Sequence, residues 1–221
     1  MRSNQKSWAL LKLGGNLRPS RPKIKNQKLL VVATGNPGKL REMQAFLSDL
    51  GTELALKPDS LEIEETGTNF AENACLKASA VAQATSSWAI ADDSGLEVDA
   101  LNGAPGIYSA RYGKTDPERI GRVLRELQGA ANRQAQFVCA IAISRPDGAI
   151  VLQSQGICRG EILDAPRGNR GFGYDPVFYV PAYQMTFAEM PPELKRQISH
   201  RAQAFQSLLP QLEKLGNEEC L

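Results

Sequence analysis

The stretch Ala91–Tyr112, ADDSGLEVDALNGAPGIYSARY, places an acidic pair after an apolar run and a basic residue after a glycine-rich loop. The run Trp88–Ala91 is typical of the end of a buried strand, so Asp92 and Asp93 are predicted at its carboxyl end, where ligands bind in open α/β sheets. Two carboxylates there can hold one Mg²⁺ and leave its remaining positions to water and phosphate oxygens. A plain Asp-Asp-Ser-Gly turn is the alternative.

Upstream, the continuous apolar run Leu29–Ala33 predicts a strand that is buried on both faces. Asn36 can cap the following helix, which has Pro37 at its first position and is expected to end at Gly51. This arrangement aims backbone N–H groups at an anion, and Lys39 adds a cation that would be unfavourable in the first turn without one. A capped helix start without a ligand explains the same residues apart from Lys39.

A second helix is predicted from Asn69, which begins a capping-box pattern, to about Ala84. The segment Leu61–Thr66 before it alternates between apolar and polar residues, as a strand does. Asn73 and Lys77 share one face of the helix because they are four residues apart. A solvated helix face is the alternative to a functional role for these two side chains.

The later part of the chain predicts a sheet of mixed strand direction. Gln136–Ser144 and Ala149–Cys158 are strand-like runs joined by the turn sequence Arg-Pro-Asp-Gly, which predicts an antiparallel hairpin. Alternation at Leu96–Ala100 predicts a separate half-buried strand, and the helix that opens at Asp116 is expected to be purely structural. Pro210 is expected to interrupt the last helix. The expected fold is therefore mixed α/β.

Two further segments carry residues suited to a planar ligand. Gly168–Pro176, GNRGFGYDP, is rich in glycine, which lets the backbone approach a flat ligand closely. Phe172 in this loop could stack on a base or merely pack the loop. Ser199 caps the last helix and places His200 and Arg201 at its electropositive first turn, although a lone histidine is more often a packing residue.

The composition is that of an ordinary globular chain, with 221 residues and 42% apolar side chains. Residues 1–28 hold eight Lys and Arg and no acid, so residues 29–221 carry a net charge of −6 while the whole chain carries +2. We expect 1–28 to be a flexible basic extension, or an organelle transit peptide, ahead of one domain at 29–221. The acidic body argues against nucleic acid as a partner.

Cysteine spacing and hydropathy bear on the compartment. The four cysteines form neither a CxxC pair nor a metal-ligand pattern, which indicates reduced thiols. No apolar run reaches the roughly 18 residues of a membrane span, and the first residues lack the apolar core of a signal peptide. A cytoplasmic protein without a membrane partner is expected.

The segments Thr34–Lys39, Asn69–Lys77, Phe172–Asp175 and Ser199–Arg201 occur in the order of one family's motifs. From residue 29 to about residue 215, the chain resembles the inosine triphosphate pyrophosphatases. The resemblance implies Mg²⁺-dependent hydrolysis of non-standard purine nucleoside triphosphates (ITP, dITP, XTP) to the monophosphate and pyrophosphate. It also implies a homodimer and a strongly twisted central sheet flanked by helices, with an antiparallel hairpin lobe and the nucleotide site in the cleft between.

The same resemblance implies roles for individual residues. Asp93 would be a metal ligand or the general base, and Glu64 would be the second Mg²⁺ ligand, with Glu65 as the alternative to Glu64. Catalysis would depend on Asp93, Asp92, Lys77 and Arg111. The residues that would bind the triphosphate and the base are Thr34, Gly35, Asn36, Pro37, Gly38, Lys39, Ser94, Phe172, Gly173, Tyr174, Asp175, Lys195, His200 and Arg201.

Hydrogen-bond donors of the protein that face the 6-position of the purine would give the selectivity for the base. Arg201 and His200 would donate hydrogen bonds to the carbonyl group of inosine and xanthine, whereas adenine presents an amino donor at the same position. Rejection of guanine needs a second filter at the 2-position, for which no residue is evident. The alternative functions are a related nucleotide pyrophosphatase with another base preference, a non-catalytic nucleotide sensor and a nucleic-acid-binding module.

Overall fold

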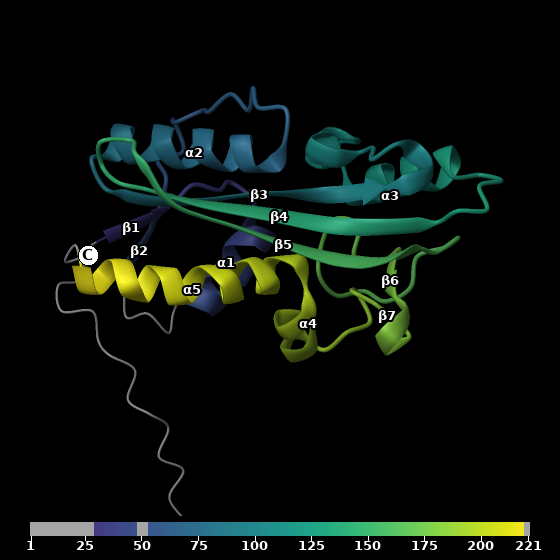
Figure 1. Ribbon diagram of the computed structural model, residues 1–221. Helices are drawn as coiled ribbons and strands as arrows, with labels where there is room; N and C mark the ends of the chain where they lie inside the picture. Colours follow the sequence, from purple (N-terminus) through teal and green to yellow (C-terminus); the bar gives the residue numbers. More distant parts are fainter. Residues whose placement is uncertain (1–28, 48–52, 219–221) are drawn as a thin grey trace, which may run out of the picture.

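The computed structural model describes residues 29–47 and 53–218, which form one seven-stranded sheet with helices on both faces (Figure 1). The strand order is β2-β1-β3-β4-β5-β6-β7; β1 runs parallel to β2 and β3, and all later pairs are antiparallel. The mixed α/β prediction is confirmed. The strands are β1 (Leu29–Val32), β2 (Glu53–Leu56), β3 (Trp88–Val98), β4 (Gln134–Ser144), β5 (Ile150–Ile162), β6 (Phe178–Val180) and β7 (Met185–Thr186).

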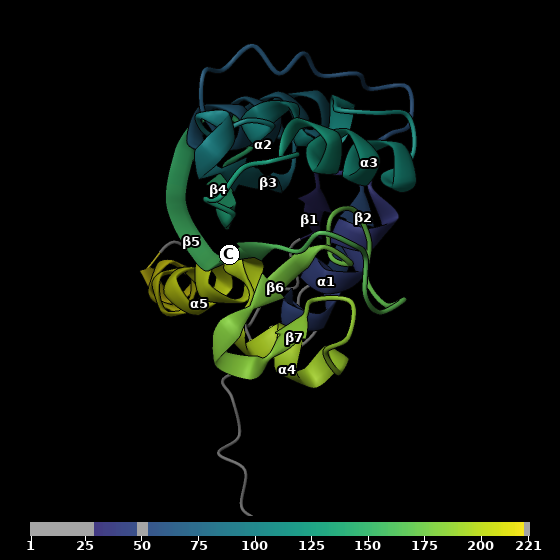
Figure 2. The ribbon, with the colours of Figure 1, turned by 90° about the vertical axis from the view of Figure 1, so that its right-hand side faces the viewer.

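Helices cover the two faces of the sheet in different sets. The helices α2 and α3 lie over one face, and α1, α4 and α5 lie over the other, as Figures 1 and 2 both show. None of the helices in the described part of the chain is long and apolar enough to cross a membrane. Their bounds are α1 (Pro37–Leu47), α2 (Phe70–Thr85), α3 (Asp116–Glu126), α4 (Pro192–Ile198) and α5 (His200–Glu218), with short 3₁₀ turns at η2 (Asp99–Leu101), η3 (Gly106–Arg111) and η4 (Pro181–Tyr183).

Alternation along β3 divides its side chains between the two helical layers. Ala89 and Ala91 pack into the cluster under α2, whereas Trp88 and Ile90 pack into the cluster that includes α1 and α5. Successive side chains of a strand point to opposite faces, so this pattern continues into the acidic pair. Asp92 therefore faces α1 and α5, and Asp93 faces α2.

The acidic pair lies in the middle of β3, so its predicted place at a strand end is wrong. β3 is one strand from Trp88 to Val98 because β4 pairs with it from Ala89 to Val98, which also merges the separate strand expected at Leu96–Ala100. The strand that ends here is β1, which pairs with β3 only as far as Ile90. The pair thus lies beside the carboxyl end of a neighbouring parallel strand, which keeps the expected ligand-binding edge.

Two further expectations need correction, and two elements were not predicted. Leu61–Thr66 is not a strand; the side of β1 away from β3 is taken by β2, and Leu61 and Ile63 pack instead against the apolar cluster under α2. The strand β2 and the short helix α4 were not predicted. The helix α5 continues through Pro210 instead of being interrupted by it.

Two expectations concern residues outside the described part of the chain. The flexible extension expected at residues 1–28 lies there, and so does the helix end expected at Gly51. The helix starts are confirmed, since Asn36 precedes α1 and the Asn69 side chain accepts a hydrogen bond from the Glu72 N–H at the start of α2. The hairpin of β4 and β5 is confirmed as well.

Candidate active site

Asp92 is the centre of a buried ion cluster on the α1 and α5 side of the sheet. Its Oδ2 accepts hydrogen bonds from Arg201 Nη2 at 2.7 Å and Nε at 3.2 Å, and its Oδ1 lies 3.3 Å from Lys39 Nζ. Burial alone would raise the pKa of Asp92, but the charges of Lys39 and Arg201 outweigh it and hold the pKa far below its usual range. Asp92 is therefore ionised and has cations against both oxygens.

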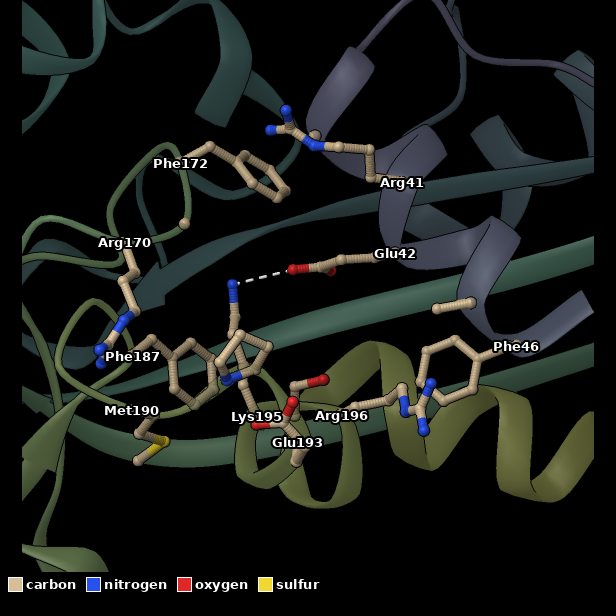
Figure 3. Close-up of a pocket in the computed structure, with 15 residues that line it drawn as sticks. Arg41, Glu42, Phe46, Arg170, Phe172, Phe187, Met190, Glu193, Lys195 and Arg196 are labelled. Atoms are coloured by element: carbon tan, nitrogen blue, oxygen red, sulfur yellow. Dashed lines mark hydrogen bonds and ion pairs between the residues drawn. The ribbon is translucent and has the colours of Figure 1, made fainter. Parts of the chain in front are cut away.

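Arg201 is held by three acceptors from two elements. Besides Asp92, its guanidinium donates to Ser94 Oγ at 2.9 Å and to Glu42, and only 1% of the residue is exposed. Glu42 also accepts from Lys195 Nζ at 2.9 Å, a contact drawn in Figure 3. Burial raises the pKa of Glu42, but Arg201 and Lys195 outweigh it and lower the pKa. The sequence analysis missed Glu42, whose only local signal is its position three residues after Lys39 on α1.

Asp93 belongs to a second cluster on the α2 side. Lys77 Nζ lies 2.8 Å from both Asp93 Oδ1 and Glu65 Oε1, and Glu65 Oε2 accepts from Arg111 Nη2 at 2.9 Å. Burial raises the pKa of Asp93 despite the opposing charge of Lys77. Asp93 Oδ2 is buried without a hydrogen-bond partner among the described residues. This oxygen is therefore available to a ligand or to a proton.

Asp93 and Glu65 are the two carboxylates of this cluster that could hold a magnesium ion. Mg²⁺ in phosphate-processing sites commonly takes one or two carboxylates and fills its other positions with water and phosphate oxygens. The described residues include no set of three or more His, Cys, Asp and Glu that could enclose a metal. Glu64, the expected ligand, is exposed, and it is its neighbour Glu65 that reaches Lys77 and Arg111.

The start of α1 offers an anion the charge of Lys39, because its backbone N–H groups are already hydrogen-bonded. Asn36 Oδ1 accepts from the N–H groups of Gly38 at 2.8 Å and Lys39 at 3.3 Å, and Thr34 Oγ1 accepts from the Asn36 N–H at 3.1 Å. The expectation that these amides point freely at an anion is therefore wrong. Lys39, whose side chain is 15% exposed, supplies the charge at this turn. Gly35 and Pro37 lie between these residues and shape the turn.

The glycine-rich loop between β5 and β6 is tied to the elements around it. Asp175 Oδ2 accepts from the Phe172 N–H at 2.8 Å and from Lys195 Nζ at 2.6 Å. The Gly173 N–H donates to Asp116 Oδ2 at 2.7 Å, and the Tyr174 hydroxyl donates to the Ser109 carbonyl at 2.8 Å. Phe172 also packs on the start of α1, where a Cβ on Gly38 would lie 2.6 Å from its ring. The loop therefore joins both helical layers.

These elements border a small pocket of about 70 Å³, which is lined by Lys39, Ser94 and Arg201 of the first cluster. Most of the expected substrate-binding residues lie around it, together with five residues that the sequence analysis did not assign to the site. The lining residues are Asn36, Lys39, Ser94, Gly95, Ser109, Ala110, Arg119, Phe137, Phe172, Gly173, Tyr174, Asp175, Lys195, His200 and Arg201.

His200 forms one wall of this pocket as a neutral imidazole. Its ring stacks on Phe137 with centroids 4.7 Å apart and an interplanar angle of 11°. Burial and the nearby charges of Arg201 and Lys195 lower the pKa of His200 well below its usual value. Its Nδ1 is buried without a partner among the described residues, so the ring retains a polar atom for a ligand.

A larger cavity of about 440 Å³ adjoins the small pocket and lies between α1, α4 and the loop at residues 170–172 (Figure 3). Phe172 and Lys195 line both spaces. In Figure 3 the rings of Phe46, Phe172 and Phe187 border the cavity, with the guanidinium groups of Arg41, Arg170 and Arg196 around it. The two spaces together offer room for a nucleotide base and its entry.

Comparison with known proteins shows which chains are similar to this one. The model of the Ham1 family matches residues 30–211. A protein of a Nostoc species named dITP/XTP pyrophosphatase is 69% identical over 84% of this chain and 94% of its own length, and a Synechocystis protein of the same name is 60% identical over 82% and 94%. The solved structure of a HAM1 protein from Coxiella burnetii superposes with a TM-score of 0.78 and 45% identity, over 85% of this chain and 99% of that one.

Proposed function

We propose that this chain, which belongs to the Ham1 family, hydrolyses the non-standard purine nucleoside triphosphates ITP, dITP and XTP to the monophosphate and pyrophosphate. The observation that carries the proposal is the arrangement across β3. Asp93 with Lys77 and Glu65 lies on one face, and Asp92 with Arg201 lies on the other, beside the small pocket. One face suits the reacting phosphates and the other suits the base.

The chain's own cations would hold the triphosphate. Lys39 pairs with Asp92, Lys77 pairs with Asp93, and Arg111 pairs with Glu65; together these cations can offset the negative charge that the phosphates carry and that shifts during the reaction. Asp93 and Glu65 would hold Mg²⁺, which when bound offsets further phosphate charge. The Lys77 ammonium, which contacts both carboxylates, positions them relative to each other.

Hydrolysis breaks the bond between the α and β phosphates by attack of water, without a covalent enzyme intermediate. Asp93 Oδ2 is the buried, unpartnered oxygen that can take the proton of the attacking water. Pyrophosphate leaves with the bridging oxygen.

The base would be selected by donor-only cations at the carboxyl-terminal helices. Four of the five N–H groups of Arg201 are engaged by Asp92, Glu42 and Ser94, and two of the three on Lys195 are engaged by Asp175 and Glu42. Among the described residues, each cation thus keeps one N–H without a partner. This N–H can donate to a 6-carbonyl, whereas neither cation can accept a hydrogen bond from a 6-amino group. Neutral His200 can donate or accept, so it contributes little to this choice.

The proposal is tested by incubating the purified protein and Mg²⁺ with ITP, dITP, XTP, GTP and ATP, and by identifying the products. Monophosphate and pyrophosphate from the first three substrates, with slow reaction of GTP and ATP, are expected. Release of orthophosphate would reject the bond assigned here. Tight binding without turnover would favour a nucleotide sensor. The mass of the protein in solution tests the homodimer that the family resemblance implies.

A further inference from the structure

We infer that Arg119, in the first turn of α3, is a specificity-determining residue that reads the 2-position of the purine; this inference rests on the proposed function. Arg119 lines the small pocket together with Lys195, His200 and Arg201. It approaches from another layer, because α3 covers one face of the sheet whereas α4 and α5 cover the other (Figures 1 and 2). The pocket therefore has donor-only cations on two sides.

The Arg119 guanidinium is fixed in place by the chain around it. Nε donates to the Gly113 carbonyl at 3.0 Å, and Nη1 lies 2.6 Å from Asp116 Oδ1. The other oxygen of Asp116 accepts the Gly173 N–H at 2.7 Å, which ties this arginine to the loop that carries Phe172. Holding the guanidinium in this way means that little side-chain entropy remains to be lost when a ligand binds.

One edge of this guanidinium is left for a ligand. Nη2 has no hydrogen-bond partner within residues 29–47 and 53–218, and the side chain is 22% exposed. Both N–H groups of Nη2 are therefore available to a ligand, and Arg119 lines the pocket. A guanidinium has no acceptor and stays charged at every accessible pH, so this edge can only reward a hydrogen-bond acceptor.

The purines that share a 6-carbonyl differ at the 2-position in the property that Arg119 detects. Xanthine carries a carbonyl acceptor there, hypoxanthine carries a hydrogen, and guanine carries an amino donor. A donor that faces the guanine amino group leaves both groups unpaired, which costs far more than the lack of a partner for a C–H. Arg119 would thus favour XTP, leave ITP nearly unaffected and reject GTP.

A purely structural role for Arg119 makes a different prediction. If Arg119 only orients the loop through Asp116 and Gly113, its loss lowers kcat/KM for every nucleotide by the same factor. The ratio between substrates therefore separates the two roles, whereas the activity on one substrate does not.

The experiment measures kcat/KM for XTP, ITP and GTP with wild-type protein, Arg119→Ala, Arg119→Gln and the control Arg125→Ala. Arg125 is an exposed arginine on the same helix and does not line the small pocket. We expect Arg119→Ala to lower kcat/KM about tenfold for XTP and less than about threefold for ITP, the scale of one lost hydrogen bond to a charged group. Arg119→Gln should raise kcat/KM for GTP relative to XTP, because the glutamine side-chain carbonyl can accept a hydrogen bond from the 2-amino group of guanine. Arg125→Ala should change none of the ratios.

Equal losses for all three nucleotides, or unchanged ratios, would overturn the inference. Calorimetric binding of the monophosphates XMP, IMP and GMP gives the same ratios without turnover, and melting temperatures show whether each variant is folded. Wild-type activity on ITP and XTP tests the proposed function itself, so the two ideas fail separately.

Discussion

Asp93 and Asp92 are neighbours in sequence, yet they act on opposite faces of one strand. Asp92 faces Arg201 with one oxygen and Lys39 with the other, whereas Asp93 Oδ2 has neither a hydrogen bond nor an ion pair among the described residues. This difference follows from strand alternation and could be inferred once both residues were placed in the same strand. It supports the proposal that Asp92 anchors Arg201 whereas Asp93 takes part in the chemistry.

Asp93→Asn should lower kcat by about 100-fold or more, the usual range for loss of a positioned proton acceptor, while nucleotide binding is largely kept. The variant removes a charge near the water and the metal but leaves Lys39 and Arg111 for the phosphates. Steady-state kinetics and calorimetric binding of ITP test this, with Asp99→Asn, an exposed position, as the control. Wild-type turnover in Asp93→Asn would contradict the assigned role.

His200 makes the stability of the fold depend on pH. Its pKa is lowered in the folded protein, so the unfolded chain binds the extra proton first. The contribution is complete above pH ~6.5, the unfolded value, and is lost as the pH falls toward the lowered pKa, by at most about 1.4 kcal/mol per pH unit. Since His200 is the only histidine, His200→Gln should remove this slope between pH 7.5 and 5.5. Thermal melts that keep the slope in the variant would contradict this origin.

At the scale of elements, the site depends on how η3 lies against β3 beyond the end of β1. Ser109 Oγ accepts the Leu96 N–H at 2.9 Å and donates to the Gly106 carbonyl at 2.6 Å. A Cβ on Gly95 would lie 2.4 Å from that hydroxyl and 2.5 Å from the Gly106 carbonyl. Glycine at position 95 therefore permits the close approach that brings Arg111 to Glu65.

Gly95→Ala should destabilise the protein by about 1–3 kcal/mol, the usual cost of overpacking, and should weaken triphosphate binding because η3 carries Arg111. Gly121→Ala on α3 is the matched control. Its added Cβ meets only the flexible end of Arg125 at 3.3 Å, and alanine favours the helix. Denaturant unfolding and KM measurements compare the two. Equal stability in both variants would show that η3 can shift without cost.

Local signals in the sequence predicted the elements whose starts are specified by neighbouring residues. Asn36 with Pro37 and Asn69 with Glu72 specify two helix starts, because capping depends on residues at most three positions apart. The continuity of β3 was not predicted, since it depends on pairing with β4, more than 30 residues away. Strand pairing of this kind leaves no local pattern.

The candidate site was predicted in the same uneven way. Asp93 was predicted from the apolar run before it and Lys77 from the helix face that it shares with Asn73, and the structure brings the two together. Glu42 and Arg119 lie on helices with ordinary charged faces, so only tertiary packing reveals that they are buried or that they line the pocket. Residues 61–66 form no strand, yet their burial alternates, so that Leu61, Ile63 and Glu65 are partly buried and Glu64 is exposed. The alternation noted in the sequence could therefore have favoured Glu65.

At the scale of the whole molecule, all seven strands of the described sheet lie after residue 28. The strand β1 begins at Leu29, and the family model matches from residue 30. Removal of residues 1–28 should therefore leave the melting temperature and kcat/KM for ITP nearly unchanged. Differential scanning calorimetry and kinetics on the shortened chain test this. A large fall in melting temperature would show that these residues pack on the domain.

The most direct test of the catalytic centre is a Mg²⁺ titration of ITP hydrolysis with wild-type protein, Glu65→Gln and Glu64→Gln. The two variants remove the same charge from adjacent residues, but only Glu65 contacts Lys77 and Arg111. We predict that chelator abolishes activity and Mg²⁺ restores it. We also predict that Glu65→Gln raises the half-maximal Mg²⁺ concentration about tenfold or more, as expected for loss of a carboxylate ligand, and that Glu64→Gln leaves it unchanged. Full activity in chelator, or a shift in Glu64→Gln alone, would contradict the assignment of Asp93, Lys77 and Glu65 as the centre of the reaction.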